Sequence, residues 1–369
     1  MYWDSKDLAA VTKVIKRGTY WTMGPEIEQL ETSVARFIGR KYGISFNSGT
    51  SALHATLLAY DYKRGDEVIV PSFTFIATAN VVVLTGATPV FADIEEQSYA
   101  LDPENVKEKI TSKTKAIIPV HYGGCPCKHI KALKEIAEDH HLTLIEDAAE
   151  SFGAKIHNTL VGTFSDAAMF SFCQNKVITA GEGGLIVTDS KSIAEKLHLI
   201  RSHGRVESKE GYFATTQDLD YIQTGYNYRM PSINAALVLS QFKKFNTIIQ
   251  MRRAKAAYLS KKLTKIKKIR TPTESNSEYY VYQLYTIELP DKTIRDHLQE
   301  YLTKAGVMTK VYFEPIHLKT YYKKEFHYKH GDFPVTEKMS EKLLTLPLYP
   351  TLTKKEMDYI VSIVEKGCK

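Results

Sequence analysis

One lysine of this chain, Lys176, stands in an unusual setting. It follows the apolar run at residues 167–172 and precedes the glycine-rich turn at residues 181–184. Lysine and arginine together number 49, and we expect most of them to be solvated surface groups. A lysine at the end of a buried strand loses hydration, and its amine then becomes a nucleophile that forms Schiff bases with carbonyl groups. Lys176 is therefore our first candidate catalytic residue.

A second segment, at residues 47–51 (Asn-Ser-Gly-Thr-Ser), follows a predicted strand and opens a predicted helix. Small residues let backbone amides approach an anion, and the helix dipole favours negative charge at this end. A phosphate group would suit the segment. A plain helix cap made by serine or threonine explains the same residues equally well.

Acidic and amide side chains follow two further elements. Asp147 comes two residues after the apolar run at residues 142–145, and a carboxylate there could bind a protonated ring nitrogen. Asn227 and Arg229 precede a long helical pattern, where they could bind a phosphate or a carboxylate. A helix cap at Asp147 and a structural turn around Arg229 are the competing interpretations.

Together these groups match the needs of one cofactor, pyridoxal 5'-phosphate. It requires a lysine for its aldehyde, an anion site for its phosphate and an acid for its ring nitrogen. The ring also needs an apolar wall. Phe73 and Phe75 follow another predicted strand end, and we favour Phe75 as the stacking ring.

The elements that must position these residues alternate along the chain. Strands are predicted at residues 43–46, 67–71, 88–91, 116–121, 142–146, 167–172 and 184–188. Helical patterns between them cover residues 51–60, 76–84, 130–140 and 192–200. Such alternation predicts an α/β fold with a mostly parallel sheet covered by helices, whose ligands gather at the carboxyl ends of the strands.

The character of the chain changes after Met230. Apolar residues at helical spacing predict one long helix reaching Leu263, followed by strands at residues 279–289 and helices at 293–305 and 354–366. We therefore expect a large domain at residues 1–245 and a small α+β domain at residues 246–369, with about the first 20 residues packing on the small domain.

Composition limits the alternatives. The chain has 369 residues, of which 43% are hydrophobic and 25% charged, as in ordinary globular proteins. Four cysteines in so long a chain indicate no disulfide framework and favour a cytoplasmic location, and the Cys125–Cys127 pair lacks a second pair for a metal site. No signal peptide, membrane span or nucleic-acid-binding helix is evident, so the net charge of +7 suits a phosphorylated small molecule.

At these motifs the chain resembles the DegT/DnrJ/StrS family of sugar aminotransferases. The resemblance runs through NSGTSALH, VPSFTFIATAN, ATPVFADI, EDAAES, SFCQNKVITAGEGG, GYNYRM, YFEPIHL and LTLPLYPTLT. It implies the aspartate-aminotransferase (type I) fold, with a seven-stranded sheet in the large domain. It also implies a homodimer whose active site lies at the subunit interface.

The resemblance implies a role for each motif residue. Lys176 would carry the cofactor and move the proton, Asp147 would bind the ring nitrogen, and Glu150 would lie near the ring hydroxyl or the substrate. The residues implied to hold the phosphate are Gly49, Thr50, Ser51, Ser171 and, from the partner subunit, Asn227. The candidates for substrate binding are Arg229, His317 and Trp21.

Within the family, the motifs EDAAES, SFCQNK and GEGG look most like GDP-perosamine synthase-like enzymes. These implied activities move the amino group of L-glutamate onto a nucleotide-diphosphate 4-keto-6-deoxy sugar for polysaccharides such as O-antigen. A 3-keto sugar substrate is one alternative. A pyridoxal-binding regulator without turnover is another, whereas Lys176 argues against a dehydratase of this scaffold, in which histidine replaces the lysine.

Overall fold

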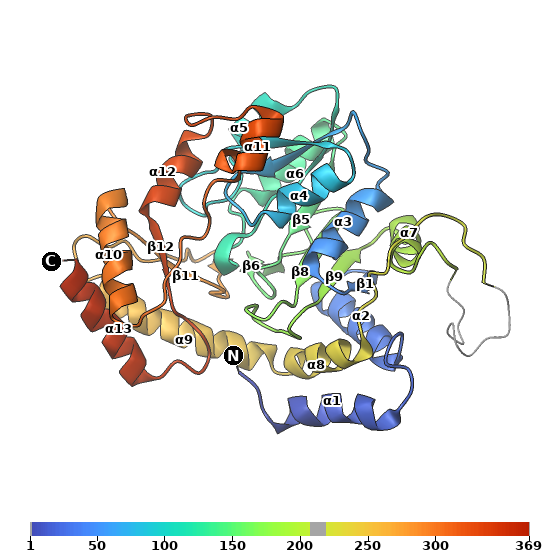
Figure 1. Ribbon diagram of the computed structural model, residues 1–369, viewed down its shortest axis with the longest axis horizontal. Coiled ribbons are helices and arrows are strands. Elements are labelled where there is room, and N and C mark those ends of the chain that lie inside the picture. Colours follow the sequence, from blue (N-terminus) through green and yellow to red (C-terminus); the bar gives the residue numbers. More distant parts are fainter. Residues whose placement is uncertain (1, 207–218, 369) are drawn as a thin grey trace.

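A seven-stranded sheet forms the centre of the computed structural model, which describes residues 2–206 and 219–368 (Figure 1). Its strand order is β1-β9-β8-β5-β4-β2-β3, and only β9 runs antiparallel to its neighbours. The strands are β1 (Tyr42–Phe46), β2 (Glu67–Pro71), β3 (Thr88–Ala92), β4 (Thr114–Ile117), β5 (Thr143–Asp147), β8 (Ala167–Ser171) and β9 (Gly184–Thr188). The predicted mostly parallel sheet is therefore confirmed.

The central strands are buried along their whole length because helices cover both faces of the sheet. Every residue of β8 and of β9 is buried, as expected for continuous apolar strands without alternation. The helices of this part of the chain are α2 (Pro25–Ile38), α3 (Gly49–Ala59), α4 (Ala77–Leu84), α5 (Pro103–Lys109), α6 (Ile130–Asp139) and α7 (Lys191–Arg201).

One strand is shorter than its sequence predicts. The pattern at residues 116–121 predicts a strand to His121, whereas β4 ends at Ile117. Pro119 has no amide hydrogen and cannot continue the ladder. Its carbonyl nevertheless accepts the amide of Asp147 at 2.9 Å, and the amide of His121 donates to the Asp147 carbonyl at 3.1 Å. The backbone of Asp147 is thus held on the β4 side after regular pairing has ended.

The long helix predicted after Met230 is broken into α8 (Ser232–Phe242) and α9 (Phe245–Leu263). At the break, the amine of Lys244 lies 2.8 Å from Asp4 and 2.7 Å from Asp7, at the start of α1 (Ser5–Arg17). Helix α1 packs along α8 instead of on the C-terminal part of the chain, where we expected it (Figure 1).

Helix α9 leads away from the sheet to a separate apolar cluster formed by residues from position 256 onward (Figure 1). Here β11 (Tyr285–Glu288) pairs with β12 (Leu343–Leu346), and α10 (Lys292–Lys304) packs on α13 (Lys354–Gly367). The remaining elements are β6 (Lys155–Ile156), β7 (Thr159–Leu160), β10 (Glu278–Tyr279), α11 (Thr320–Phe326), α12 (Pro334–Lys342), and the 3-10 turns η1 (Tyr122–Gly124) and η2 (Ile316–Leu318).

The strand predicted at residues 279–289 is interrupted between β10 and β11. In the interruption, the amides of Val281 and Leu284 donate to the carbonyls of Gly124 and Gly123, at 3.0 and 2.9 Å. The C-terminal part of the chain is therefore joined by backbone hydrogen bonds to the loop that follows β4, close to the carboxyl edge of the sheet.

Candidate active site

The carboxyl edge of the sheet brings Lys176 and Glu150 together. Lys176 lies in the loop between β8 and β9, and its Nζ is 3.4 Å from Oε1 of Glu150. Their side chains are only 14% and 8% exposed. The other oxygen of Glu150 accepts the amide of Gly123 at 2.8 Å, which fixes the carboxylate in place. The amine is thus enclosed and lies beside an acid.

Asp147 ends β5 at the same edge and is 5% exposed. Its Oδ2 accepts the Thr78 hydroxyl at 2.8 Å, and its Oδ1 accepts the amide of Ala149 at 3.2 Å. Burial raises the pKa of Asp147, although these two hydrogen bonds and the charge of Lys176 oppose the shift. A buried carboxylate with a raised pKa is stabilised when a cationic partner arrives, such as a protonated ring nitrogen.

The residue before it, Glu146, is saturated with donors and anchors this end of β5. It accepts hydrogen bonds from Nε2 of His121 (2.9 Å), the amides of Gly162 (2.8 Å) and Phe164 (3.0 Å), and the hydroxyl of Ser165 (2.7 Å). Burial alone would raise the pKa of Glu146, but these bonds and His121 lower it overall. Glu146 therefore holds the strand end that presents its neighbour. Sequence reasoning missed this role because the partners come from distant segments.

The predicted phosphate segment opens α3, with Ser48 as the cap residue accepting from the amide of Ser51 at 3.0 Å. Gly49 lies against β8: a side chain there would approach the Cβ of Ser171 to 3.1 Å. The amides of Gly49 and Thr50 begin the helix, where no intrahelical acceptor exists, and thus remain able to bind an anion. Thr50 is exposed at this helix start.

Ser51 requires a correction. Its hydroxyl lies 2.5 Å from Oδ1 of Asn47 and accepts the amide of Ser48 at 3.1 Å, which completes a reciprocal cap. A hydroxyl already engaged in this way serves the helix end. The structure therefore assigns Ser51 to capping, and does not support the predicted phosphate contact.

His317 also requires a correction. We expected it at the substrate entrance, but it is fully buried in η2. Its Nδ1 lies 2.6 Å from the hydroxyl of Ser72, and its Nε2 lies 3.0 Å from Oε1 of Glu337. With both ring nitrogens occupied and no exposed surface, His317 is a structural residue that joins η2 and α12 to the end of β2.

Three predicted site residues lie on exposed surface: a ring contact, a substrate contact and a phosphate contact. Phe75 is 59% exposed just before α4, three residues before the Thr78 that reaches Asp147. Trp21 is 49% exposed in the loop between α1 and α2. Asn227 is exposed too, and its carbonyl accepts the side-chain amide of Asn47 at 3.4 Å. Asn227 thus reaches the residue before the α3 cap within the same chain.

Arg229 is half-buried near a second basic residue. Its Nη1 donates to the hydroxyl of Ser202 at 3.3 Å. Desolvation lowers the pKa of the neighbouring His203, and the positive charges of Arg229 and Arg205 lower it further. The segment before α8 therefore contains closely spaced positive charges, which is consistent with binding an anionic substrate.

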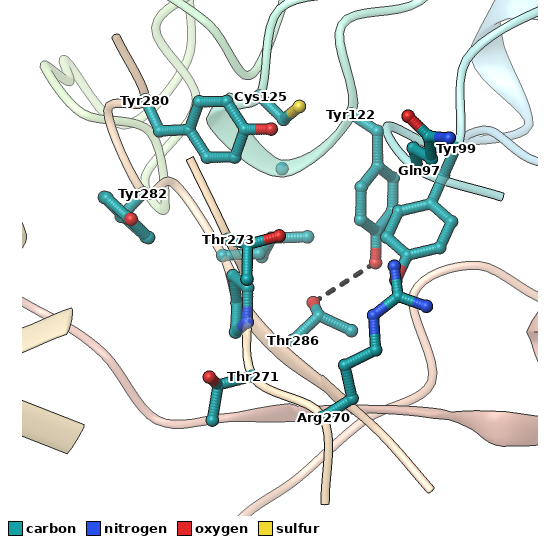
Figure 2. Close-up of a pocket in the computed structure, with 13 residues that line it drawn as sticks. Gln97, Tyr99, Tyr122, Cys125, Arg270, Thr271, Thr273, Tyr280, Tyr282 and Thr286 are labelled. Atoms are coloured by element: carbon teal, nitrogen blue, oxygen red, sulfur yellow. Dashed lines mark hydrogen bonds between the residues drawn. The ribbon is translucent and has the colours of Figure 1, made fainter. Parts of the chain in front are cut away.

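The cavity shown in Figure 2 is lined by neither Lys176 nor Glu150 and is not the site of the chemistry. Its wall includes Tyr122, whose hydroxyl lies 3.2 Å from that of Thr286, and Cys125. Its volume of about 50 Å³ holds one or two waters. Within residues 2–206 and 219–368, no group of three histidine, cysteine or acidic side chains could hold a metal ion.

The residues at the sheet edge fit pyridoxal phosphate. An enclosed amine at Lys176, a buried carboxylate whose pKa is raised at Asp147, and the helix-start amides of Gly49 and Thr50 match the aldehyde, the ring nitrogen and the phosphate. Of the helices that the structure describes, none is long and apolar enough to cross a membrane.

Comparison with known proteins places these features in a family. The model of the DegT/DnrJ/EryC1/StrS aminotransferase family matches residues 2–365. The chain is 38% identical over 350 residues to an uncharacterized protein of Methanocaldococcus jannaschii, covering 94% of this chain and 90% of the relative. It is 32% identical to the spore coat polysaccharide biosynthesis protein SpsC of Bacillus subtilis, covering 97% of this chain and 93% of the relative.

A solved structure agrees with the fold. The chain superposes with a TM-score of 0.90 on DesV of S. venezuelae, solved in complex with a ketimine intermediate, at 31% identity over 99% of this chain and 95% of DesV. The sequence match, the fold and the geometry at the sheet edge agree with one another. The chain belongs to the DegT/DnrJ/EryC1/StrS family and is a pyridoxal-phosphate-dependent sugar aminotransferase.

Proposed function

We propose that this aminotransferase moves the amino group of L-glutamate onto a nucleotide-diphosphate-linked 4-keto-6-deoxy sugar, in the manner of GDP-perosamine synthase, for polysaccharide biosynthesis. The observation that carries the proposal is the enclosed amine of Lys176, held 3.4 Å from Glu150 at the sheet edge that also presents Asp147. The similarity to SpsC, a spore coat polysaccharide biosynthesis protein, supports the pathway class.

In this proposal each residue has a defined task. Lys176 Nζ would hold the cofactor between turnovers and, when released, would take up the proton of the donor's α-carbon. The Asp147 carboxylate holds the proton of the ring nitrogen, and Thr78 and the Ala149 amide orient that carboxylate. The bound cofactor supplies an electron sink for the electrons of the broken C–H bond.

The remaining site residues bind and orient. Gly49, Thr50 and Ser171 hold the phosphate, and Phe75 packs on the ring. Glu150 keeps a carboxylate beside Nζ. Arg229 and Trp21 contact the nucleotide sugar, whose diphosphate is attracted to the basic segment that includes Arg205.

We further propose a homodimer in which Asn227 of each chain contributes to the partner's phosphate site. Exposed apolar side chains support this part of the proposal. They lie on the α1–α2 loop, before α4 and in the segment that leads to Asn227: Tyr20, Trp21, Phe75, Tyr221, Ile222 and Tyr226. Burying such side chains against a second copy would remove unfavourable apolar surface from water.

The test offers the purified, cofactor-loaded protein L-glutamate and a panel of 3-keto and 4-keto nucleotide sugars. We expect glutamate alone to remove the visible absorption band, and a 4-keto-6-deoxy sugar to restore it and gain an amine, detected by mass spectrometry. Amination of only 3-keto sugars would favour the alternative substrate. A stable band with every amino donor would identify a regulator without turnover and overturn the proposal.

A further inference from the structure

A cavity of about 320 Å³ lies between the loop that carries Lys176 and the C-terminal part of the chain. Its wall includes Lys176 and Asn175 from the loop, Arg252 from α9, and Gln283 and Tyr312. The volume is many times that of a single water, about 30 Å³. The cavity therefore adjoins the loop that carries Lys176 and offers room for a small organic molecule.

Arg252 is the charged residue of interest in this wall. It is 5% exposed, and its Nη1 donates to the carbonyls of Tyr282 (3.1 Å), Gln283 (3.4 Å) and Leu348 (3.2 Å). Among the residues that the structure describes, neither Nε nor Nη2 has a hydrogen-bond partner, and no carboxylate lies within 4.0 Å of the guanidinium.

A buried cation without a counter-ion is energetically unfavourable. Burial lowers the pKa of Arg252 to about 10, so the side chain still carries its charge at neutral pH. Three backbone carbonyls hold its orientation through Nη1. Nε and Nη2 form the side of the guanidinium that binds a carboxylate through two parallel hydrogen bonds. Nε is itself buried without a partner, so the guanidinium keeps an unmet need for an anion, which a carboxylate of matching charge would supply.

The next residue along α9 provides an internal contrast. Arg253 lies 2.9 Å from Glu274 and stacks on the ring of Tyr279, with 4.1 Å from the guanidinium carbon to the ring centre. Arg253 does not line the cavity. Two consecutive arginines therefore differ: one has its anion within the described chain, and the one that lines the cavity does not.

A second buried residue in the same wall also has an atom without a hydrogen-bond partner among the described residues. Gln283 is 4% exposed, and its Oε1 has no partner among residues 2–206 and 219–368. Its Nε2 donates to the carbonyl of Asn175, the residue before Lys176. Gln283 thus connects the Arg252 side of the cavity to the lysine loop, so a molecule bound here would reach both.

We propose that Arg252 binds a carboxylate of the amino-acid donor and so orients the donor toward Lys176. This inference rests on the proposed aminotransfer from an amino acid. It adds the donor's anchoring residue, which is distinct from the residues that hold the cofactor and from the basic segment around Arg229. The other anion in the reaction is the diphosphate of the nucleotide sugar, and the experiment distinguishes the two.

The experiment uses the cofactor-loaded protein and measures the loss of its visible band as L-glutamate is added without any sugar. Arg252→Lys keeps a positive charge but loses the planar guanidinium with its several donors. We expect it to raise the half-saturating glutamate concentration at least tenfold. Arg253→Lys is the matched control and should leave that concentration within twofold of wild type. Glutarate, an unreactive dicarboxylate, should bind the wild type and the control but not Arg252→Lys in calorimetric titration.

A second variant guards against misfolding of the first. Gln283→Glu keeps the side-chain size and places a carboxylate in the same wall, where it would compete with the donor for Arg252. We expect it to weaken glutamate and glutarate binding at least tenfold while the half-saturating concentration of the keto sugar stays unchanged.

Two results would refute the carboxylate site, and a third would refute the proposed function. Wild-type glutamate affinity in both variants would refute the carboxylate site while leaving aminotransfer intact. Weaker binding of a nucleoside diphosphate to Arg252→Lys, with glutamate unaffected, would show that the site serves the sugar nucleotide and would also refute it. Glutarate binding that depends on Arg252, in a protein that converts no amino acid, would instead refute the proposed function and support the site.

Discussion

Two buried regions of this molecule, one around His317 and Glu337 and one around Asp147, each contain a carboxylate. They differ in how many hydrogen-bond partners the chain provides for it. Around His317, the ring contacts Ser72 and Glu337, and Glu337 also accepts the amide of Gly331 at 2.8 Å. Around Asp147, the hydrogen-bond donors to the carboxylate within residues 2–206 and 219–368 are Thr78 and the Ala149 amide, and burial raises the pKa of Asp147.

The difference separates structure from function. A buried polar group that is fully hydrogen-bonded stabilises one conformation, whereas a group with an incomplete set of partners lowers stability unless a ligand completes it. Glu146 and Asp147 show the same contrast within two residues, because the pKa of the first is lowered and that of the second is raised. The predictions below test this contrast.

The largest effect is expected for Lys176→Ala. Removing the amine eliminates both the attachment point of the cofactor and the group that moves the proton, so turnover should fall by about four orders of magnitude. Glutamate-dependent product formation measures it. The variant should still bind the cofactor through the remaining contacts, and normal activity in it would contradict the assignment.

Asp147→Asn should lower turnover on the order of a hundredfold, because the charge opposite the ring nitrogen is lost. The same change should stabilise the cofactor-free protein at neutral pH. The pKa of Asp147 is raised in the folded chain, so its ionised form opposes folding at pH values above its ordinary 3.8. Thermal unfolding of the cofactor-free protein checks this. A loss of stability at pH 7 would show that the carboxylate is already satisfied.

His317→Ala should have the opposite profile. It leaves Ser72 and Glu337 without a buried partner, and we expect the free energy of unfolding to fall by about 2–3 kcal/mol. The half-saturating concentrations of both substrates should be unchanged in the folded fraction. Denaturant titration and steady-state kinetics separate the two effects, and a selective loss of sugar affinity would restore His317 as a substrate contact.

The pH dependence of stability gives a related test. Burial lowers the pKa of His317 from its ordinary 6.5, with Glu337 opposing the shift. The unfolded chain therefore binds a proton more readily, and the stability contributed by the neutral ring is lost as the pH falls below 6.5. We expect His317→Gln to flatten the decline of unfolding free energy between pH 7 and 5, relative to wild type. An unchanged slope would exclude His317 as its source.

The smallest effect is expected for Phe75→Leu. Loss of an aromatic stacking contact costs about 1 kcal/mol, or roughly a fivefold weaker affinity for pyridoxal phosphate. Fluorescence titration of the cofactor measures it. Phe73→Leu is the control, because Phe73 is fully buried and should affect stability more than cofactor affinity.

Local sequence patterns predict the strands of the central sheet, and the structure confirms its mostly parallel order. The buried strands and the position of Lys176 after one of them follow from local patterns, because an apolar run or a glycine turn can be recognised within a few residues. The close approach of Gly49 to Ser171 is consistent with those patterns, because Gly49 follows β1 and Ser171 ends β8, and the two strands end at the same edge of the sheet.

Tertiary structure decided which polar side chains are already satisfied. The partners of His317 come from positions 72 and 337, and the hydroxyl of Ser51 is taken up by its own helix cap. The sequence also did not indicate that Arg252, unlike Arg253, is buried without an anion. Such distinctions depend on contacts between distant segments, and a residue's type and spacing do not reveal whether a partner elsewhere in the chain will reach it.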